Sequence, residues 1–533
     1  MSAAGYSRPM TAAGLALLLC GVAPAALAQQ AQTQQALATA STQATGISQE
    51  QLLALVGRLD ALEQRNEALE AQILDLKAAQ ASGNQALREQ ASANTVSLAN
   101  GRPTFATGDG QFTASIRGII QLDAAQYDQR RPGTLAADVR RGSVGDATEA
   151  DRARDLGDGT NFRRVRLGVE GKAWGDWNYN LLLDFGGSGV EEAGKITNAY
   201  VEYAGLQPLK FRVGAFAPIT GLEDATLNTA SLFPERAAVT ELVRGFAGGD
   251  GRTGAAVLAN GDRWSVFGGV TGATVVTQNF DEQLGVVGRI TWLPMKGQDS
   301  LVHVGANVNL IVNPATTGPD IAPAGAASPV RLRERPELRV DGTRLIDTGN
   351  IDADSLSSYG LELGWQQKRF TLQGEYFWID VARRNSLLAG PKFSGWYGQA
   401  AWTLTGQARR YNTANGGFDV PRVEAPFSLK AKTWGIWELA ARYSELDLNY
   451  RPGGAGTAPS ASAVRGGDQK IFTLGLNWYP NNNVRFLADY QRAEVRRLSP
   501  GGATFGAGAL TPPAGAQIGQ DLNIWSFRTQ YAF

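Results

Sequence analysis

The chain contains one histidine and one cysteine in 533 residues, so it has few of the side chains that most metal sites and covalent catalysts require. His303 is the single candidate for a histidine-centred triad, and the lone Cys20 cannot supply a disulfide framework or a zinc cluster. We therefore expect no catalytic residue, no metal and no cofactor. The 50 Lys and Arg residues are balanced by 50 Asp and Glu residues, and this zero net charge argues against nucleic acid as a partner.

Long apolar runs are also missing once the amino-terminal segment is set aside. Residues 1–28 have the order of a secretory signal peptide, with a basic residue, an apolar stretch and the small-residue sequence Ala-Leu-Ala at 26–28. Cleavage before Gln29 would remove Cys20 and leave a mature chain without cysteine. An exported chain of this size without an apolar helix is either soluble or enters a membrane as a closed barrel.

Two polar segments flank a heptad pattern near the predicted mature amino terminus. Residues 29–46 are rich in Gln, Ala and Thr, which predicts a flexible spacer, and 81–103 reads as a Ser/Asn/Ala linker. Between them, residues 47–80 carry apolar side chains in alternating steps of three and four, which predicts a short α-helical coiled coil. The alternative is a single amphipathic helix packed on its own domain. The seam consists of Leu52, Leu55, Leu59, Leu62, Asn66, Leu69, Ile73 and Leu76.

From residue 104 onward the hydrophobic period changes to two, the spacing of a strand with one apolar face. In the first strand, Ile120 and Leu122 alternate with Gln121 and Asp123. The pattern predicts an all-β fold, a 16-stranded antiparallel transmembrane β-barrel over residues 104–533, preceded by the coiled coil. The predicted strands are 112–123, 162–171, 177–186, 197–205, 208–216, 253–260, 263–271, 283–293, 300–311, 358–367, 369–380, 395–406, 433–446, 471–479, 482–494 and 521–533.

The predicted connections alternate in length along the chain. Short turns such as 261–262, 294–299 and 480–483 come at every second joint, with 407–432 as an exception. The long connections are 125–161, 217–252, 312–357, 447–470 and 495–520. Long loops on one side and short turns on the other are typical of outer-membrane barrels.

Aromatic residues at predicted strand ends agree with a membrane setting, because amphipathic rings prefer the boundary between membrane and water. The last predicted strand ends in the aromatic residue Phe533. Such an ending resembles the recognition signal for barrel assembly. The strand-end aromatics are Trp174, Trp177, Trp292, Trp365, Trp402, Trp434, Trp478 and Tyr479.

Arginine outnumbers lysine 40 to 10, and three groups of basic residues predict a pathway for anions. Strand alternation directs Arg164 and Arg166 into the lumen and leaves Arg163 near the rim. The long loop 312–357 carries four arginines, of which the first three share one side of an extended segment. A third group follows strand eleven. The loop arginines are Arg331, Arg333, Arg335 and Arg339, and the third group is Arg383, Arg384 and Lys392. Alternatively, loop 312–357 stays in solvent or binds lipopolysaccharide.

Short segments along the predicted barrel combine paired charges, glycines and aromatic residues: Phe162-Arg163-Arg164, Asp176-Trp177, Gly221-Leu222-Glu223, Glu235-Arg236, YGQAAWTLTG at 397–406, Trp437-Glu438-Leu439, Arg442-Tyr443 and Leu476-Asn477-Trp478-Tyr479. Together they resemble the phosphate-selective porin O and P family, over about residues 105–533. The resemblance implies a homotrimer of 16-stranded barrels whose third extracellular loop narrows the pore, with an arginine ladder leading to a lysine-rich phosphate site. The matching positions are Arg331, Arg333, Arg335 and Arg339 for the ladder, Arg163 and Arg164 for a paired arginine, and Arg383 and Lys392 for further cations.

The chain departs from the family at the predicted constriction. Asp224 and Thr229 stand where the family has lysines, and Ile119 stands where an inward arginine is expected. The candidate third extracellular loop, 217–252, therefore predicts a mixed-charge constriction with a transverse field, in which the central phosphate site is absent. The charged residues of this loop are Glu223, Asp224, Glu235 and Glu241 beside Arg236, Arg244 and Arg252.

These patterns predict an outer-membrane porin of a Gram-negative bacterium that takes up small inorganic anions, phosphate or polyphosphate, through an arginine-lined lumen. Its expected partners are outer-membrane lipid, lipopolysaccharide and two further copies of the chain, with the coiled coil in the periplasm. A general porin for another solute is one alternative. A coiled-coil tether anchored by the barrel is another, and a barrel enzyme built on His303 is a third.

Overall fold

The computed structural model describes residues 48–129, 156–187, 195–275, 281–318, 327–501 and 514–533. The predicted signal peptide and spacer, 1–46, lie outside these residues. The chain divides into an amino-terminal helical unit, ending near residue 90, and a barrel unit. Among the helices of the described part, none combines the length and the apolar character needed to cross a membrane.

The helical unit is one long helix, α2 (Gln49–Ala93). It continues past residue 80, so the prediction of a linker over 81–103 is wrong for residues 81–93. Alanine, glutamine, leucine, arginine and glutamate in that stretch are good helix formers, and they outweigh the few Ser, Gly and Asn residues. The seam side chains that were predicted to face partner helices are exposed in the single chain, Leu59 at 52% and Leu69 at 47%.

After the helix, a small hairpin precedes the barrel wall. Its strands are β1 (Asn94–Ser97) and β2 (Thr104–Thr107), and β2 continues the hydrogen bonding onto the first wall strand, β3 (Thr113–Gln129). The second half of the predicted linker is therefore partly ordered as a strand.

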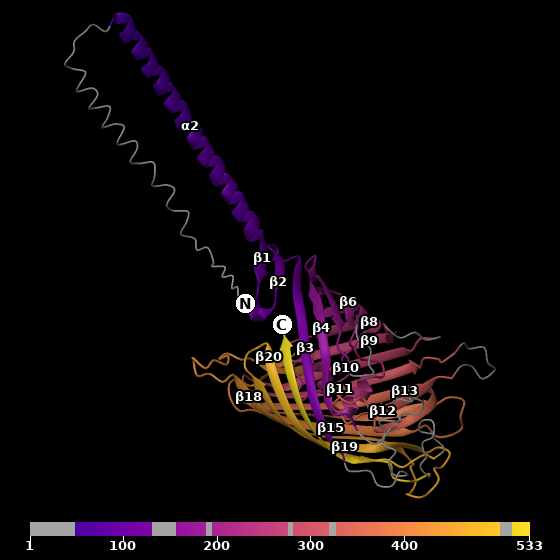
Figure 1. Cartoon of the computed structure of the whole chain (residues 1–533). Coiled ribbons are helices and arrows are strands. Elements are labelled where there is room, and N and C mark those ends of the chain that lie inside the picture. The colour runs from indigo at the N-terminus through magenta and orange to yellow at the C-terminus, as the bar shows by residue number, and fades with distance from the viewer. Residues whose placement is uncertain (1–47, 130–155, 188–194, 276–280, 319–326, 502–513) are drawn as a thin grey trace, which may run out of the picture. The chain divides into compact units, whose positions relative to one another are not determined.

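Sixteen antiparallel strands form the barrel wall within the described residues, which confirms the predicted fold (Figure 1). Each wall strand pairs with the next one along the chain, and β21 pairs with β3 to close the barrel. The wall consists of β3, β4 (Gly159–Ala173), β5 (Trp177–Asp184), β6 (Lys195–Leu206), β7 (Leu209–Phe216), β8 (Arg252–Asn260), β9 (Trp264–Thr274), β10 (Leu284–Lys296), β11 (Ser300–Asn313), β13 (Ile346–Gln367), β14 (Phe370–Arg383), β15 (Lys392–Thr403), β18 (Ile436–Tyr450), β19 (Val464–Tyr479), β20 (Val484–Arg496) and β21 (Asp521–Ala532).

The ends of the wall differ as the sequence predicted. Tight turns such as 261–263 and 480–483 join strands at one end, and the longer loops lie at the other. Outward-facing tryptophans follow the short-turn end, among them Trp292 and Trp402, each 55% exposed. One strand-end aromatic departs from this pattern: Tyr479 follows the outward Trp478, so alternation turns it inward, where its hydroxyl donates to Glu438 at 2.7 Å.

Two long loops fold into the barrel. The first, 217–251, contains the short helices α4 (Leu222–Ala225) and α5 (Ala238–Arg244). The second, described over residues 314–318 and 327–345, contains β12 (Pro329–Glu334), which forms a hairpin with the start of β13. Its inward fold is shown by Glu337, whose carboxylate accepts a hydrogen bond from the hydroxyl of Ser444 on wall strand β18 at 2.7 Å.

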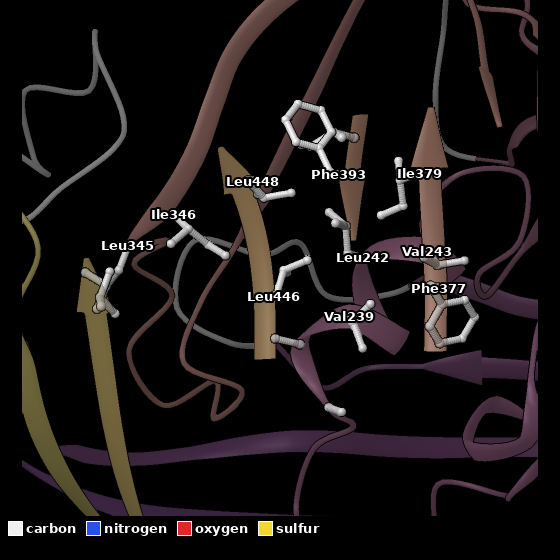
Figure 2. Packing of buried hydrophobic residues seen from close by; sticks show 14 of the residues in the cluster. Val239, Leu242, Val243, Leu345, Ile346, Phe377, Ile379, Phe393, Leu446 and Leu448 are labelled. Atoms are coloured by element: carbon white, nitrogen blue, oxygen red, sulfur yellow. The ribbon is translucent and has the colours of Figure 1, made fainter. Parts of the chain in front are cut away.

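An apolar cluster holds both loops against one side of the wall (Figure 2). Val239, Leu242 and Val243 of α5 pack with inward side chains of β14 and β18, such as Phe377 and Leu446. These wall strands are apolar on both faces at this level, which explains why strict alternation of apolar and polar residues fails there. The fixed loops narrow the lumen.

The exception in the turn pattern also has a structural explanation. The connection from β15 to β18 lies at the short-turn end and contains a small hairpin, β16 (Arg409–Asn412) and β17 (Gly417–Pro421). It folds up into the barrel, where Arg289 of β10 donates to the backbone carbonyls of Asn415 and Gly416 at 2.6 and 2.7 Å. This connection is long because it fills part of the lumen from below.

Candidate permeation pathway

Three cavities inside the barrel share lining residues and so form a series. The first, about 400 Å³, lies between α5 and the β12–β13 hairpin near the long-loop end. The second, about 240 Å³, shares Glu241 and Arg339 with the first. The third, about 260 Å³, lies toward the short-turn end and shares Arg166, Arg244 and Asp250 with the second. Arginines line all three.

The predicted ladder is only partly formed around the first cavity. Arg331, Arg333 and Arg339 line it together with Arg344, which the sequence analysis did not select. Arg335 does not follow its neighbours, because β12 ends at Glu334 and Pro336 comes next; its side chain is buried. The prediction that the first three arginines share one side is therefore wrong for the third.

Two arginines of the first cavity, Arg331 and Arg339, are paired with carboxylates. Arg331 donates to Asp347 through Nε at 2.8 Å. Arg339 donates to Glu241 at 2.5 Å and lies 3.8 Å from Glu235. The first junction in the series is thus an ion pair between the second long loop and α5.

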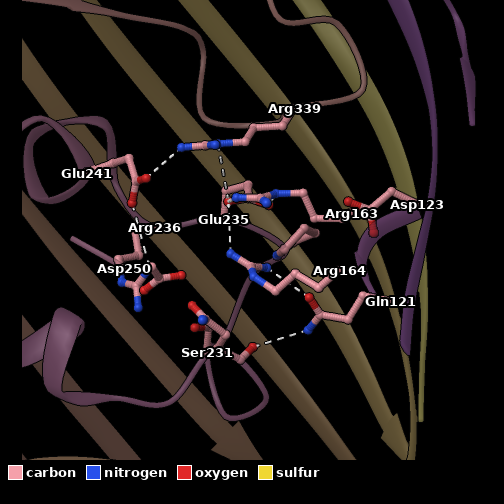
Figure 3. Close-up of polar contacts among 12 residues, drawn as sticks. Gln121, Asp123, Arg163, Arg164, Ser231, Glu235, Arg236, Glu241, Asp250 and Arg339 are labelled. Atoms are coloured by element: carbon pink, nitrogen blue, oxygen red, sulfur yellow. Dashed lines mark hydrogen bonds and ion pairs between the residues drawn. The ribbon is translucent and has the colours of Figure 1, made fainter. Parts of the chain in front are cut away.

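The second cavity is surrounded by the arginines of β4 and by the network around Glu235 (Figure 3). Arg163 donates to both oxygens of Glu235, at 2.7 and 3.2 Å, and Arg164 lies 3.7 Å from the same carboxylate. The sequence analysis placed Arg163 near the rim. A β-bulge corrects this: Gln121 pairs with Arg164 and Leu122 with Phe162, so Arg163 is the extra residue and also turns inward.

Glu235 is buried, and its carboxylate is the centre of the network rather than part of a cavity lining. Burial alone would raise its pKa, but Arg163, Arg164 and Arg528 outweigh this effect and hold the pKa of Glu235 well below the ordinary glutamate value. Arg528 reaches it from the last wall strand at 3.1 Å. Glu235 is therefore ionised, and its ion pairs connect the first long loop to wall strands β4 and β21.

The second junction consists of Asp250, Arg166 and Arg244. Arg166 donates to Asp250 at 2.5 Å and to Asp184 at 2.8 Å, and Arg244 also contacts Asp250. Burial would raise the pKa of Asp250, yet Arg244 and Arg166 hold it well below the ordinary aspartate value. Two guanidinium groups from different elements meet at one carboxylate.

The third cavity contains the residues that depart from the family pattern. Ile119, Asp224 and Thr229 all line it, in a place where the family's cations were expected. Asp224 accepts from Arg244 at 2.6 Å and lies 3.5 Å from Arg236. This lining carries both charges, as predicted for a mixed-charge constriction.

The remaining predicted site residues do not line the three cavities. Glu223 is buried and accepts from Arg442 of β18 at 3.1 Å, so it anchors the first long loop to the wall. Arg252 donates to the carbonyl of Gly248 at 2.9 Å. Arg383 donates to the carbonyls of Ala389 and Ser462. Arg384 forms an ion pair with Asp352, and Lys392 forms one with Asp380. None of these three basic residues lines the three cavities described here.

His303 is buried beside the inserted hairpin. Its Nδ1 lies 2.7 Å from the Tyr411 hydroxyl and its Nε2 lies 3.2 Å from Glu362, which is paired with Arg289. These neighbours connect the wall to the hairpin, and they include no serine, threonine or cysteine that could serve as a nucleophile in a triad.

Sequence reasoning missed several residues of the pathway. Asp250, Asp184, Arg117 and Arg212 line the cavities but were not selected. Asp250 could have been noticed, because it lies within Gly248-Gly249-Asp250-Gly251, a run of glycines interrupted by one charge at the end of the predicted constriction loop.

A closed barrel of sixteen antiparallel strands, with aromatic residues at its boundary and loops folded into a charged lumen, defines an outer-membrane porin. The chain belongs to the phosphate-selective porin O and P family, whose model matches residues 137–504. As a porin it is a channel and not an enzyme.

Two curated proteins are similar over most of the chain. Porin O of Pseudomonas aeruginosa is 27% identical over 421 residues, which cover 76% of this chain and 89% of that protein. An uncharacterised protein of Caulobacter vibrioides is 29% identical over 420 residues, covering 77% and 74% of the two chains.

Solved structures give weaker similarity. The trimer form of OmpT, an outer-membrane protein of Vibrio cholerae, matches with a TM-score of 0.45 at 11% identity, covering 79% of this chain and 99% of that one. An anion-selective porin from Comamonas acidovorans matches with a TM-score of 0.44 at 12% identity, covering 79% and 100%.

Proposed function

We propose that this porin mediates passive uptake of small inorganic anions, with phosphate as the first solute to test. The supporting observation is the series of three cavities, in which each cavity presents arginine side chains. Guanidinium groups placed in succession let an anion pass between sites that bind it without trapping it. The name of the matching family, phosphate-selective porin O and P, agrees with this proposal.

The carboxylates at both junctions favour a weaker selectivity than an unpaired arginine ladder would give. Glu241 and Asp250 each neutralise part of the positive charge where the pathway passes between cavities. A general porin with a mixed-charge constriction is the alternative that these pairs support.

The decisive experiment is the zero-current potential of the purified protein in a planar bilayer under a KCl gradient, followed by phosphate addition to the same membrane. The proposal expects anion preference with a reduction of the chloride current by phosphate. Anion preference without any effect of phosphate would leave an anion pore without a phosphate site. Cation preference would overturn the proposal.

A charge-removal variant tests whether the first cavity lies on the pathway. We expect R331A/R333A to lower the ratio of anion to cation permeability by about twofold or more, since clefts of one charge raise local counter-ion concentration by at least about tenfold. The matched control is R263A/R369A, which removes two arginines from short turns at the other end. Equal ratios in the two variants would place the ladder outside the pathway.

We also propose that the protein resides in the outer membrane of a Gram-negative bacterium, among lipopolysaccharide and other outer-membrane lipids, as a homotrimer. In this proposal α2 lies in the periplasm as a parallel coiled coil of three copies. The exposed seam from Leu52 to Leu76 supports it, because apolar a and d positions require partner helices.

A further inference from the structure

A single carboxylate, that of Asp250, joins the two elements that border the second junction of the pathway. Arg166 comes from wall strand β4 and Arg244 from α5 of the first long loop. Asp250 accepts from Arg166 Nη2 at 2.5 Å, and its other oxygen contacts Nη2 of Arg244. The carboxylate therefore occupies the position between two guanidinium groups.

The Asp250 carboxylate is more exposed than the two guanidinium groups that it contacts. Its side chain is 29% exposed, whereas the side chains of Arg166 and Arg244 are 8% and 10% exposed. All three residues line both the second and the third cavity. Asp250 therefore lies where the two cavities adjoin.

The backbone around Asp250 is built for close approach. Gly249 and Gly251 have φ values of +94° and +67°, which side chains with a Cβ rarely adopt. A Cβ on Gly251 would also lie 2.3 Å from the carbonyl oxygen of Ile196, and a Cβ on Gly248 would lie 2.6 Å from Thr220. The glycines thus place one acidic residue against two arginines in a space that excludes other side chains.

We infer that Asp250 is a specificity-determining residue, an internal competitor that occupies the anion position between Arg166 and Arg244. This inference rests on the proposed anion pathway. A permeating anion has to share the two guanidinium groups with a tethered carboxylate, so it binds weakly and leaves quickly. Removal of the carboxylate charge converts the junction into a tighter binding site for an inorganic oxyanion.

The test compares D250N with the wild type in planar bilayers, using chloride as the current carrier and inorganic phosphate as the probe. We expect the ratio of anion to cation permeability to rise and the phosphate concentration for half-block to fall by about fivefold or more, the effect of one unit charge at contact. The matched control, D262N, removes the same charge from an exposed turn and should leave both values unchanged. Unchanged values in D250N would overturn the inference.

The double variant R166Q/D250N separates a local effect from a general change in charge. If Asp250 competes for Arg166, the double variant should lose most of the phosphate affinity gained in D250N. Retention of that affinity would contradict the assigned position. Heat-modifiable migration in gels reports whether each variant contains a folded barrel.

A cysteine variant covers the case in which D250N does not fold. The mature chain is predicted to contain no other cysteine, so D250C can be modified in the bilayer with either a sulfonate-bearing or a neutral methanethiosulfonate. The negative reagent should weaken phosphate block and the neutral one should not. Equal effects of the two reagents would overturn the inference.

The wild-type measurement keeps the two proposals distinguishable. If the wild type prefers cations while D250N shifts toward anions, the proposed function fails and the role of Asp250 stands. If the wild type prefers anions and D250N does not differ from it, the role of Asp250 fails alone.

Discussion

At the scale of single residues, the two loops inside the barrel carry carboxyl groups whose pKa values are shifted in opposite directions. Glu241 has its pKa lowered to about 2, because Arg339, Arg244 and Arg236 outweigh the cost of its burial. Burial acts in the opposite direction on Glu334 and Glu337, whose pKa values are raised above the ordinary 4.5 despite nearby arginines. The same loops therefore carry carboxylates that titrate at different pH.

This difference predicts a pH dependence of selectivity. As the pH is lowered, Glu334 and Glu337 take up protons before an ordinary glutamate does, while Glu241 and Asp250 stay ionised to lower pH than ordinary carboxyl groups. Loss of two negative charges should raise the anion preference by about twofold, measured from zero-current potentials at several pH values. The control is the double variant E334Q/E337Q, whose anion preference should already be raised at neutral pH and should stay the same as the pH is lowered. A wild-type preference that does not change with pH would contradict the prediction.

A second prediction at this scale concerns Glu235. The E235Q substitution leaves the guanidinium groups around it without their shared counter-ion, and breaking a buried ion pair on one side costs about 3–5 kcal/mol. We expect a lower temperature for the loss of heat-modifiable migration. Since Lys296 pairs with Asp262 on the surface, D262N should leave that temperature unchanged, and an equal shift in both variants would refute the role of Glu235.

At the scale of elements, the helix α5 connects packing to permeation. Its apolar face is fixed in the cluster of Figure 2, while its charged residues Glu241 and Arg244 face the two junctions. A seven-residue helix is too short to be stable alone, so its position depends on tertiary contacts.

The L242A substitution tests this dependence. Removal of a buried leucine side chain typically costs about 2–5 kcal/mol through lost burial and the cavity left behind. We expect noisier single-channel current and higher conductance, because α5 is held less firmly at the junctions. The control is L387A, since Leu387 is fully exposed in a loop. Identical current records for the two variants would show that this contact does not position α5.

At the scale of the whole molecule, the barrel and the amino-terminal helix form two separate structural units. The sheet closes on itself through β3 and β21, and this closure does not use α2. A chain lacking residues 49–90 should therefore conduct with the selectivity of the wild type, while chemical cross-linking should recover fewer trimers than with the intact chain. Loss of conduction would support the alternative in which the helix is indispensable. Unchanged cross-linking would remove α2 from the proposed assembly.

The family was accessible through the resemblance of short segments such as Phe162-Arg163-Arg164. The fold was accessible from sequence because a barrel in lipid must satisfy each backbone hydrogen bond between strands and must alternate its side chains. That alternation also placed Arg164 and Arg166 in the lumen correctly. It failed for Arg163, since a bulge is a local exception that depends on the partner strand. It also failed for Arg335, which follows the end of β12.

The amino-acid order by itself determined the sixteen wall strands, the two kinds of connection and the presence of the amino-terminal helix, because each of these depends on periodicity along the chain. Only the tertiary structure decided which loops enter the lumen and which charges neutralise one another. Arg528 meets Glu235 across 293 positions of sequence, and Asp250 meets Arg166 across 84. Such pairs form when the barrel closes and the loops pack inside it, and no local pattern encodes the partner of a charge that lies in a different element.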